Sequence, residues 1–387
     1  MIRGLLEASK GWTHAPRAAL LLAVGFAAAL SCRDAPNPEA AKRPAKVALP
    51  KVDVHLHIDL RIGEQALAIL EENGVIMGLN ASGGEPGPEL SASLRFARSH
   101  GDRLLPLCNF RFSALREPDF ASYASTVLAA CKAGGGRGLK VSKYLGLGLT
   151  DDSGALVPVD DPRLDPVFEA AGVLGLPVLI HSGDPKAFFA PNTPDNERYD
   201  ELHVHPGWSF HGLAPNGQAW PSWETLLQQH EARVARHPKT TFIGAHFGNA
   251  AEEPQRVARM LRAYPNYFID TAARVPEFGR HAADRMRRFF LEFRTRVLFG
   301  SDLGVGPEGL TLGSGGDRPG TRAEARPFFD RHWAYFETRG KKMTHPTPIQ
   351  GRWTIDGISL PQEVLAAVYA DNALRLFGLK LPSASRD

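Results

Sequence analysis

Two hydrophobic patterns alternate along residues 50–380. Short apolar runs, typical of buried strands, are followed by segments whose apolar residues recur every three or four positions, as on one face of a helix. The runs predict strands at residues 51–57, 75–79, 138–145, 177–181, 240–246, 267–271 and 296–301, and one within 103–112. The second pattern predicts helices between them, including residues 223–237 and 277–293, and a last helix at 360–377. This alternation predicts an α/β protein with the (β/α)8 (TIM) barrel fold.

Two of the predicted connections are much longer than the others. Residues 183–221, after the fifth strand, are rich in polar, aromatic and proline residues, and residues 303–327, after the eighth, are rich in glycine and proline. We therefore expect long loop insertions after strands 5 and 8. An open doubly wound sheet is the alternative, but no Gly-x-Gly-x-x-Gly motif follows the first strand, which disfavours a dinucleotide-binding version.

The first 49 residues follow neither pattern. Residues 18–30 form an apolar run after a basic segment, too short for a membrane span but typical of a signal peptide. The run ends at Cys32 in a sequence that resembles a bacterial lipobox, with an ordinary cleaved signal as the alternative. We expect a lipoprotein-type signal peptide at residues 1–32, a flexible tether at 33–49 and the barrel at 50–380. The protein would then be exported to the periplasm or cell envelope and anchored there through lipid on Cys32.

Composition narrows the partners. The apolar content of 43% and charged content of 22% are ordinary for a globular protein, and the net charge of +3 gives no electrostatic basis for binding nucleic acid. We expect a small-molecule substrate, membrane contact only through the N-terminal lipid, and a homodimer as the assembly to consider. Cys108 and Cys131 lie in a strand-like and a helix-like segment. We predict two buried unpaired thiols, with a disulfide as the alternative.

Ionisable side chains stand where several apolar runs end. His55 and His57 are two residues apart in one strand and so point to the same face. His181 ends the fifth strand, His246 the sixth and Asp302 the eighth. The C-terminal ends of barrel strands meet at one rim, so these side chains should converge. Each could be a hydrogen-bonded structural residue, but imidazoles and carboxylates together are the ligands of zinc and similar ions. The set predicts a divalent-metal site and hence an enzyme.

Five motifs in order resemble those of a known family. They are VDVHLH (52–57), GLK (138–140), PVLIH (177–181), FIGAHFG (242–248) and VLFGSD (297–302), followed by the ending YADNALRLFG (369–378). The set resembles the amidohydrolase superfamily, and more closely its amidohydrolase-related branch, which includes aminocarboxymuconate-semialdehyde decarboxylase. The resemblance spans roughly residues 50 to 380 and implies a metal-dependent TIM barrel.

The resemblance also implies roles for individual residues. Four positions match metal ligands: His55, His57, His181 and Asp302. Asp302 would bind the metal or activate water, and His246 would act as acid or base, or bind a second metal. Lys140 matches a lysine that is carboxylated in two-metal relatives; it could instead pair with Asp302 or a substrate carboxylate. We expect one divalent ion, Zn²⁺ being favoured, with two ions as the alternative.

Three functions are compatible with these features. The first is a metal-dependent hydrolase that directs a metal-activated water at an amide, ester or lactone of a small organic substrate, with Asp302 and His246 as catalytic residues. The second is a metal-dependent non-oxidative decarboxylase (a carboxy-lyase) of an aromatic or muconate-type acid, because the resembled branch contains such enzymes. The third, of another class, is a catalytically inactive secreted binding lipoprotein.

Three further residues are candidates for substrate binding. Arg274 follows the seventh strand and could bind a carboxylate, or pair with Asp270. Trp208 and Trp220 lie in the long loop after the fifth strand and predict an aromatic lid over the barrel, with a self-packed loop as the alternative.

Overall fold

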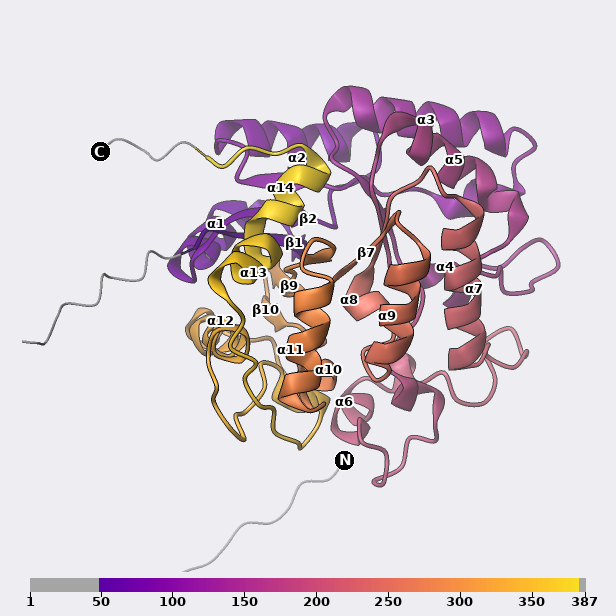
Figure 1. Cartoon of the computed structure of the whole chain (residues 1–387). Helices are drawn as coiled ribbons and strands as arrows, with labels where there is room; N and C mark the ends of the chain where they lie inside the picture. The colour runs from indigo at the N-terminus through magenta and orange to yellow at the C-terminus, as the bar shows by residue number, and fades with distance from the viewer. Residues whose placement is uncertain (1–48, 383–387) are drawn as a thin grey trace, which may run out of the picture. The chain divides into compact units, whose positions relative to one another are not determined.

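The structure is a computed structural model and describes residues 49–382 (Figure 1). The predicted signal peptide, Cys32 and residues 33–48 of the predicted tether lie outside this range. None of the helices in the described part of the chain is long and apolar enough to span a membrane.

Parallel strands form the centre of the fold. They are β1 (Lys51–Ile58), β2 (Val75–Asn80), β3 (Leu104–Pro106), β4 (Leu139–Val141), β5 (Val178–Ile180), β6 (Phe242–Gly244), β7 (Tyr267–Asp270) and β8 (Val297–Leu298). Strands β1 to β3 pair in chain order in one sheet, and β4 to β8 pair in chain order in a second. Each pair of neighbours is parallel, as βαβ connections require.

Hydrogen bonds join the two sheets along both seams. Beyond β3, Cys108 accepts a backbone hydrogen bond from Lys140 of β4 (2.8 Å) and donates one to Gly138 (2.8 Å). On the other side, the amide of Val54 on β1 donates to the carbonyl oxygen of Phe299, directly after β8 (3.0 Å). The strands therefore close on themselves, and the predicted (β/α)8 barrel is confirmed.

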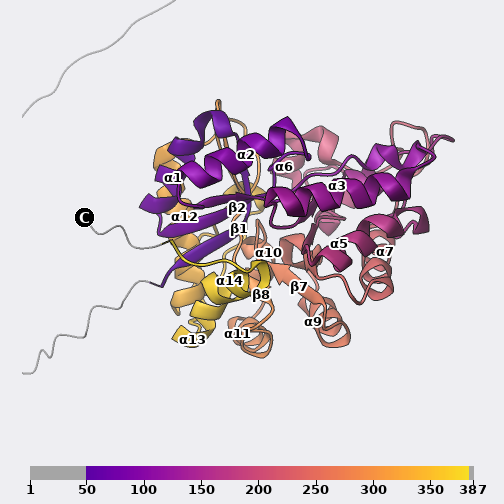
Figure 2. The same ribbon diagram turned by 90° about the horizontal axis from the view of Figure 1, so that it is seen from above.

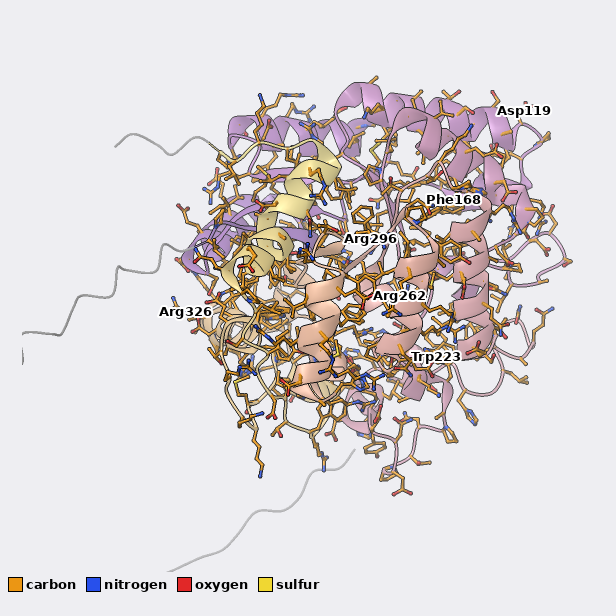
Figure 3. All side chains as sticks on the ribbon, in the orientation of Figure 1. Asp119, Phe168, Trp223, Arg262, Arg296 and Arg326 are labelled. Carbon is orange, nitrogen blue, oxygen red and sulfur yellow. A yellow bond between two sulfur atoms is a disulfide. The ribbon has the colours of Figure 1, made fainter. Side chains whose placement is uncertain are left out.

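Amphipathic helices surround the barrel (Figures 1 and 2). The main ones are α1 (Gly63–Glu72), α2 (Pro88–Ser99), α3 (Phe120–Gly134), α5 (Asp165–Leu174), α7 (Trp223–Arg236), α9 (Pro254–Ala263), α11 (Ala283–Glu292), α12 (Arg322–Glu337), α13 (Gln362–Ala366) and α14 (Asn372–Phe377). Phe168 on α5, labelled in Figure 3, packs against Phe242 of β6 with ring centres 5.8 Å apart. On the outer surface, Arg262 of α9 binds Glu292 of α11 (2.6 Å). Apolar inner faces and polar outer faces thus fix the helices on the barrel.

The region after β8 differs from the predicted loop. Residues 303–312 form a hairpin of β9 (Leu303–Gly306) and β10 (Gly309–Leu312), and α12 begins at Arg322. β9 pairs in parallel with β1, so His57 lies opposite Gly304. The glycine-rich composition suggested irregular chain, but pairing with β1 satisfies the backbone of β9. The single helix predicted at 277–293 is also wrong, because the chain breaks between α10 (Val275–Gly279) and α11.

The two cysteines of the barrel form a disulfide, so the prediction of unpaired thiols is wrong. Cys108 lies just beyond β3 and Cys131 near the end of α3, with Cα atoms 6.2 Å apart. Gly136 makes room for the bond, because a Cβ there would lie 2.3 Å from Sγ of Cys108 and 2.7 Å from Sγ of Cys131. Closing this loop in the unfolded chain stabilises the fold by roughly 3 kcal/mol.

Candidate metal centre and active site

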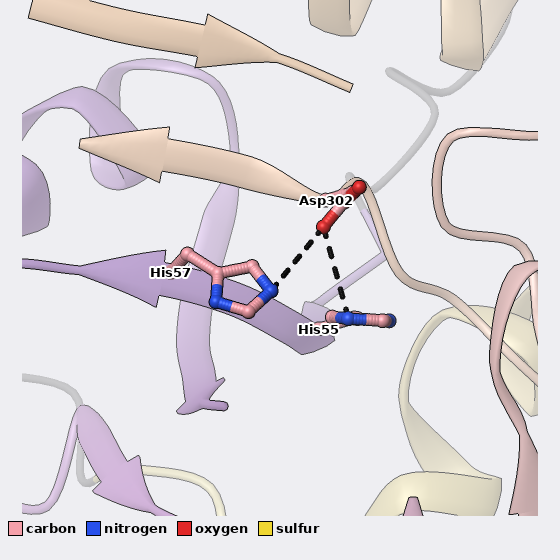
Figure 4. Close-up of side chains that lie close together, drawn as sticks. All are labelled: His55, His57 and Asp302. Carbon is pink, nitrogen blue, oxygen red and sulfur yellow. Dashed lines mark ion pairs between the residues drawn. The ribbon is translucent and has the colours of Figure 1, made fainter. Parts of the chain in front are cut away.

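Two imidazoles and one carboxylate meet at the C-terminal rim of the barrel (Figure 4). The Nε2 atoms of His55 and His57, both on β1, are 3.7 Å and 3.5 Å from Oδ1 of Asp302, which follows β8. One ligand atom from each of the three residues lies within 4.8 Å of the other two. The structure therefore brings together three of the four residues predicted to bind the metal.

The backbone fixes this arrangement. The amide of Asp302 donates to the carbonyl oxygen of His55 (3.0 Å). This backbone hydrogen bond holds the Cα atoms of the two residues close together, so their side chains can meet. Asp302 has a φ of 62°, a left-handed conformation that aspartate adopts more readily than most residues. At Gly300, a Cβ would lie 3.1 Å from Cβ of His55 and 3.3 Å from Cβ of Ala272, so glycine avoids a tight contact where the two strands approach.

His55 has a partner at each ring nitrogen. Its Nδ1 is 2.8 Å from Oδ2 of Asp270, which ends β7 and is fully buried. A carboxylate can only accept, so Nδ1 carries the proton and Nε2 keeps its lone pair. That Nε2 is 2.8 Å from Nζ of Lys140 on β4. The sequence marks Asp270 only as a partner for Arg274, whereas in the structure its carboxylate orients His55.

The charge states suit a metal centre. Burial lowers the pKa of His55 well below its usual value and also lowers the pKa of His57, so both imidazoles are neutral at neutral pH. Burial acts to raise the pKa of Asp302, but neighbouring positive charges, among them those of Lys140 and Arg274, outweigh it, and the pKa is lowered overall. Burial lowers the pKa of Lys140 to about 8. The cluster thus offers neutral nitrogen donors and an anionic oxygen donor.

The spacing of these donors also fits a divalent ion. Ligand atoms at 2.0–2.2 Å from a tetrahedral zinc are about 3.4 Å from one another. The separations of 3.7 Å and 3.5 Å from Asp302 Oδ1 to the two histidine nitrogens are close to that value. Asp270 supplies the carboxylate partner that a metal-bound histidine usually has on its other nitrogen. His55, His57 and Asp302 therefore fit the ion that the sequence predicts.

His246 lies beside His55, and His181 beside His246, but neither is part of the group formed by His55, His57 and Asp302. The histidine rings form a row, with ring centres 5.4 Å apart for His57 and His55, 4.9 Å for His55 and His246, and 4.3 Å for His246 and His181. Nε2 of His181 faces the carbonyl oxygen of Gly183 (2.9 Å) and Oδ1 of Asp184 (3.4 Å). His181 could bind the ion through Nε2 only if its ring turned away from Gly183 and Asp184. Otherwise Nδ1 would have to be the ligand atom.

Asp184 is a buried carboxylate at the site that is not among the residues predicted from the sequence. Its Oδ2 forms an ion pair with Nζ of Lys143 (2.5 Å), and its Oδ1 faces Nε2 of His181. The Lys143 charge and these hydrogen bonds lower the pKa of Asp184 strongly, although burial opposes them. The signal in the sequence was its position three residues beyond a strand-ending histidine, where a loop residue can turn back to the ring.

A cavity of about 340 Å³ lies at this rim, and its lining includes His57, His181, His246 and Asp302. Arg274 and Trp208, two of the predicted substrate-binding residues, also line it, and so does the buried Gln350. Trp220 does not line the cavity, and it packs edge-on against Phe210 with ring centres 5.1 Å apart. The loop after β5 therefore contributes both to the cavity wall and to a small core of its own.

A second, wider cavity of about 1140 Å³ adjoins the first. The two share part of their lining, made of His57, Gly304, Thr311 and Gly315. The hairpin of β9 and β10 thus separates an inner compartment from an outer one. A substrate larger than the inner cavity can extend into the outer cavity past His57.

The profile of the amidohydrolase family matches residues 110–379, more than half of the chain. The chain belongs to the amidohydrolase family. This confirms the resemblance to the amidohydrolase-related branch, and the family consists of metal-dependent enzymes. No curated protein sequence matches the chain significantly.

This amidohydrolase is similar to several solved structures. One is 2,6-dihydroxybenzoate decarboxylase from Rhizobium (17% identity, 85% of this chain and 99% of that chain, TM-score 0.45). Another is a probable 2-pyrone-4,6-dicarboxylic acid hydrolase from Acinetobacter baumannii with citric acid bound (13% identity, 85% and 99%, TM-score 0.47). A third is an amidohydrolase from Burkholderia multivorans with bound zinc (15% identity, 85% and 99%, TM-score 0.45).

Proposed function

We propose that this amidohydrolase is a metal-dependent hydrolase of a small organic acid derivative, an amide, ester or lactone. The observation that carries the proposal is the ionised Asp302, which lines the cavity and lies within 3.7 Å of the Nε2 atoms of both His55 and His57. A carboxylate at this place can both complete a metal site and accept a proton. Zinc is the ion we propose, because neutral imidazole and carboxylate are its usual ligands.

In this proposal His55, His57 and Asp302 hold the ion, and His181 joins them if its ring turns. When bound, a divalent ion lowers the pKa of a water ligand from about 15.7 to about 7 and polarises a carbonyl group. Asp302 accepts the proton of the attacking water at a carboxylate oxygen. The same oxygen then returns the proton to the leaving amine or alcohol, so the carboxylate is restored after each turnover.

The protonation state of His246 narrows its proposed role, because it disfavours action as an acid. Its Nδ1 is 3.0 Å from the carbonyl oxygen of Ala272, which can only accept, so Nδ1 carries the proton. Burial and the neighbouring His181 lower the pKa of His246 well below its usual value, which keeps the ring neutral. Nε2 is then an acceptor without a proton. We propose that it orients the attacking water, or binds a second ion, rather than protonating the leaving group.

Arg274 supports a substrate with an acidic group. Its side chain is largely buried at the cavity wall and donates to the carbonyl oxygen of Ala273 (3.1 Å), but no carboxylate among residues 49–382 forms an ion pair with it. A buried guanidinium without a counter-ion favours an anionic ligand. Together with the indole of Trp208, it also favours the second candidate, decarboxylation of an aromatic or muconate-type acid.

Removing the metal tests the proposal directly. We expect the purified enzyme to hold a stoichiometric divalent ion, to lose hydrolytic activity after dialysis against a chelator, and to regain it with Zn²⁺. The assays measure release of acid from amides, esters and lactones, and release of carbon dioxide from aromatic acids. Carbon dioxide without hydrolysis would favour the decarboxylase, and a metal-loaded protein with neither activity would contradict both.

Replacing Arg274 tests the substrate class. We expect Arg274→Gln to raise KM for carboxylate-bearing substrates by about 10- to 100-fold, because a charge-assisted hydrogen bond contributes roughly 1.5–3 kcal/mol. Neutral substrates of similar shape should change by less than about threefold. Arg280→Gln is the matched control, since Arg280 forms an ion pair with Glu197 and lies outside the inner cavity. Equal changes for charged and neutral substrates would contradict the assignment.

A further inference from the structure

The segment after β6 has an unusual backbone. His246, Phe247, Gly248 and Asn249 all have positive φ, with values of 56°, 59°, 69° and 58°. The element labelled α8 (Ala245–Gly248) is therefore a left-handed turn. Left-handed conformations are unfavourable for residues with a side chain, and consecutive ones persist only where the surroundings hold them. The turn carries His246 into the active-site cavity, so whatever holds the turn also places that imidazole.

Two contacts hold the first half of the turn. The amide of His246 donates to Oδ1 of Asp270 at 2.7 Å. The buried ring of Phe247 packs between α10 and α11, with ring centres 4.6 Å from Phe278 and 4.9 Å from Phe289. Neither contact fixes Gly248 and Asn249, which complete the turn.

The hydroxyl of Tyr267 fills the space inside the turn. A Cβ on Gly244 would lie 2.1 Å from this oxygen, and a Cβ on Gly248 would lie 2.7 Å from it. Tyr267 begins β7 and is fully buried, so its hydroxyl reaches the turn from the neighbouring strand. Only glycine leaves room for the tyrosine hydroxyl at these two positions, and the hydroxyl packs against the backbone at both ends of the turn.

A chain of hydrogen bonds extends from this hydroxyl to the strand of His181. Nε2 of His230 on α7 is 3.0 Å from the Tyr267 oxygen, and Nδ1 of His230 is 2.7 Å from Oγ of Ser182. Burial lowers the pKa of His230 to about 4, so the ring is neutral and has one donor and one acceptor. Either tautomer completes the chain. All three side chains are buried, so water does not compete for these bonds.

A second link joins the same two segments. The amide of Ser182 donates to Oδ1 of Asn249, the last residue of the turn, at 3.2 Å. Ser182 directly follows His181, whose ring centre is 4.3 Å from that of His246. The ends of β5 and β6 are thus tied together twice, once through Asn249 and once through His230 and Tyr267.

We propose that Tyr267 and His230 are positioning residues that set the spacing of His246 and His181 in the cavity. They touch neither the cavity nor the proposed metal ligands, and they act through Ser182 and the left-handed turn. The inference rests on the proposed function in so far as it concerns catalysis. The placement of the turn itself is independent of that function and can be measured without a substrate.

The test compares Tyr267→Phe with Tyr369→Phe. Tyr369 is also buried and its hydroxyl binds Glu337 (3.1 Å), so the control loses a buried-tyrosine hydrogen bond away from the turn. For Tyr267→Phe we expect kcat to fall about 10- to 100-fold with KM within about twofold, because a small displacement of a catalytic group has effects of this size. Amide hydrogen exchange at residues 246–250 should become at least about 10-fold faster in this variant only.

Variants of His230 provide the rescue experiment. Glutamine keeps one donor and one acceptor, so His230→Gln should retain several-fold more kcat than His230→Leu, at equal thermal stability. The proposal would be overturned if Tyr267→Phe matched Tyr369→Phe both in kcat and in amide hydrogen exchange at residues 246–250. It would also be overturned if His230→Gln and His230→Leu lost kcat equally. If the wild type proves inactive on every substrate, the proposed hydrolase fails. The exchange comparison then decides the positioning role by itself: faster exchange confined to Tyr267→Phe supports it, and equal exchange overturns it.

Discussion

Replacing Asp302 by asparagine should lower kcat by about 1000-fold, the largest effect that we expect from any single substitution. Asparagine has nearly the same shape, but its amide cannot accept a proton from water, and loss of a general base typically costs about 10²- to 10⁴-fold. Its oxygen can still approach an ion, so the bound metal should fall less than in His57→Ala, which removes a nitrogen donor outright. Steady-state kinetics with metal analysis of the same preparations measures both quantities.

Asp330→Asn is the matched control for this experiment. Asp330 on α12 forms an ion pair with Arg326 at the surface (2.9 Å) and lines neither cavity. We expect its kcat to stay within about threefold of the wild type. An Asp302→Asn enzyme that keeps full metal and wild-type turnover would remove Asp302 from the mechanism. A protein without metal would instead show that the carboxylate is chiefly a ligand.

The barrel and the core of its site could be predicted because they follow from local patterns. Buried parallel strands leave apolar runs in the sequence, and polar residues at their ends must face the rim where all these ends meet. His55, His57 and Asp302 stand out for this reason, and the structure brings them together. The same reasoning names His181 and His246 but cannot give the direction of a ring nitrogen, which depends on loop partners such as Gly183 and Asp184.

Other features depend on contacts between distant segments and leave no local signal. The disulfide forms because Gly136 lets the end of α3 approach the residue after β3, which the spacing of Cys108 and Cys131 does not reveal. The sequence of the β9–β10 hairpin is typical of a glycine-rich loop, and only the pairing of β9 with β1 shows that it forms strands. Asp270 ends a strand like the other site residues, but only the structure shows that its carboxylate binds one ring nitrogen of His55 and the amide of His246.

Asp270→Asn should weaken metal binding by about 10- to 100-fold, although Asp270 is not expected to touch the ion. The reason lies in the tautomer of His55. The carboxylate accepts from Nδ1 and leaves the Nε2 lone pair for the metal, whereas an asparagine amide that donates to Nδ1 would move the ring proton to Nε2. Competition with a chromophoric chelator measures the dissociation constant for Zn²⁺. Circular dichroism and thermal unfolding show whether the variant is folded.

Asp53→Asn separates this effect from the loss of any buried carboxylate near the site. Oδ1 of Asp53 accepts from the amides of His55 (3.0 Å) and Ser301 (3.2 Å), which an asparagine oxygen can also do. Burial raises the pKa of Asp53 to about 7, so near neutral pH the substitution replaces a group that is already partly protonated. We expect its affinity for Zn²⁺ to stay within about threefold of the wild type. Equal affinities in Asp270→Asn and Asp53→Asn would show that the tautomer of His55 does not control the site, whereas a difference of tenfold or more would show that the carboxylate on β7 prepares the histidine on β1 to bind the ion.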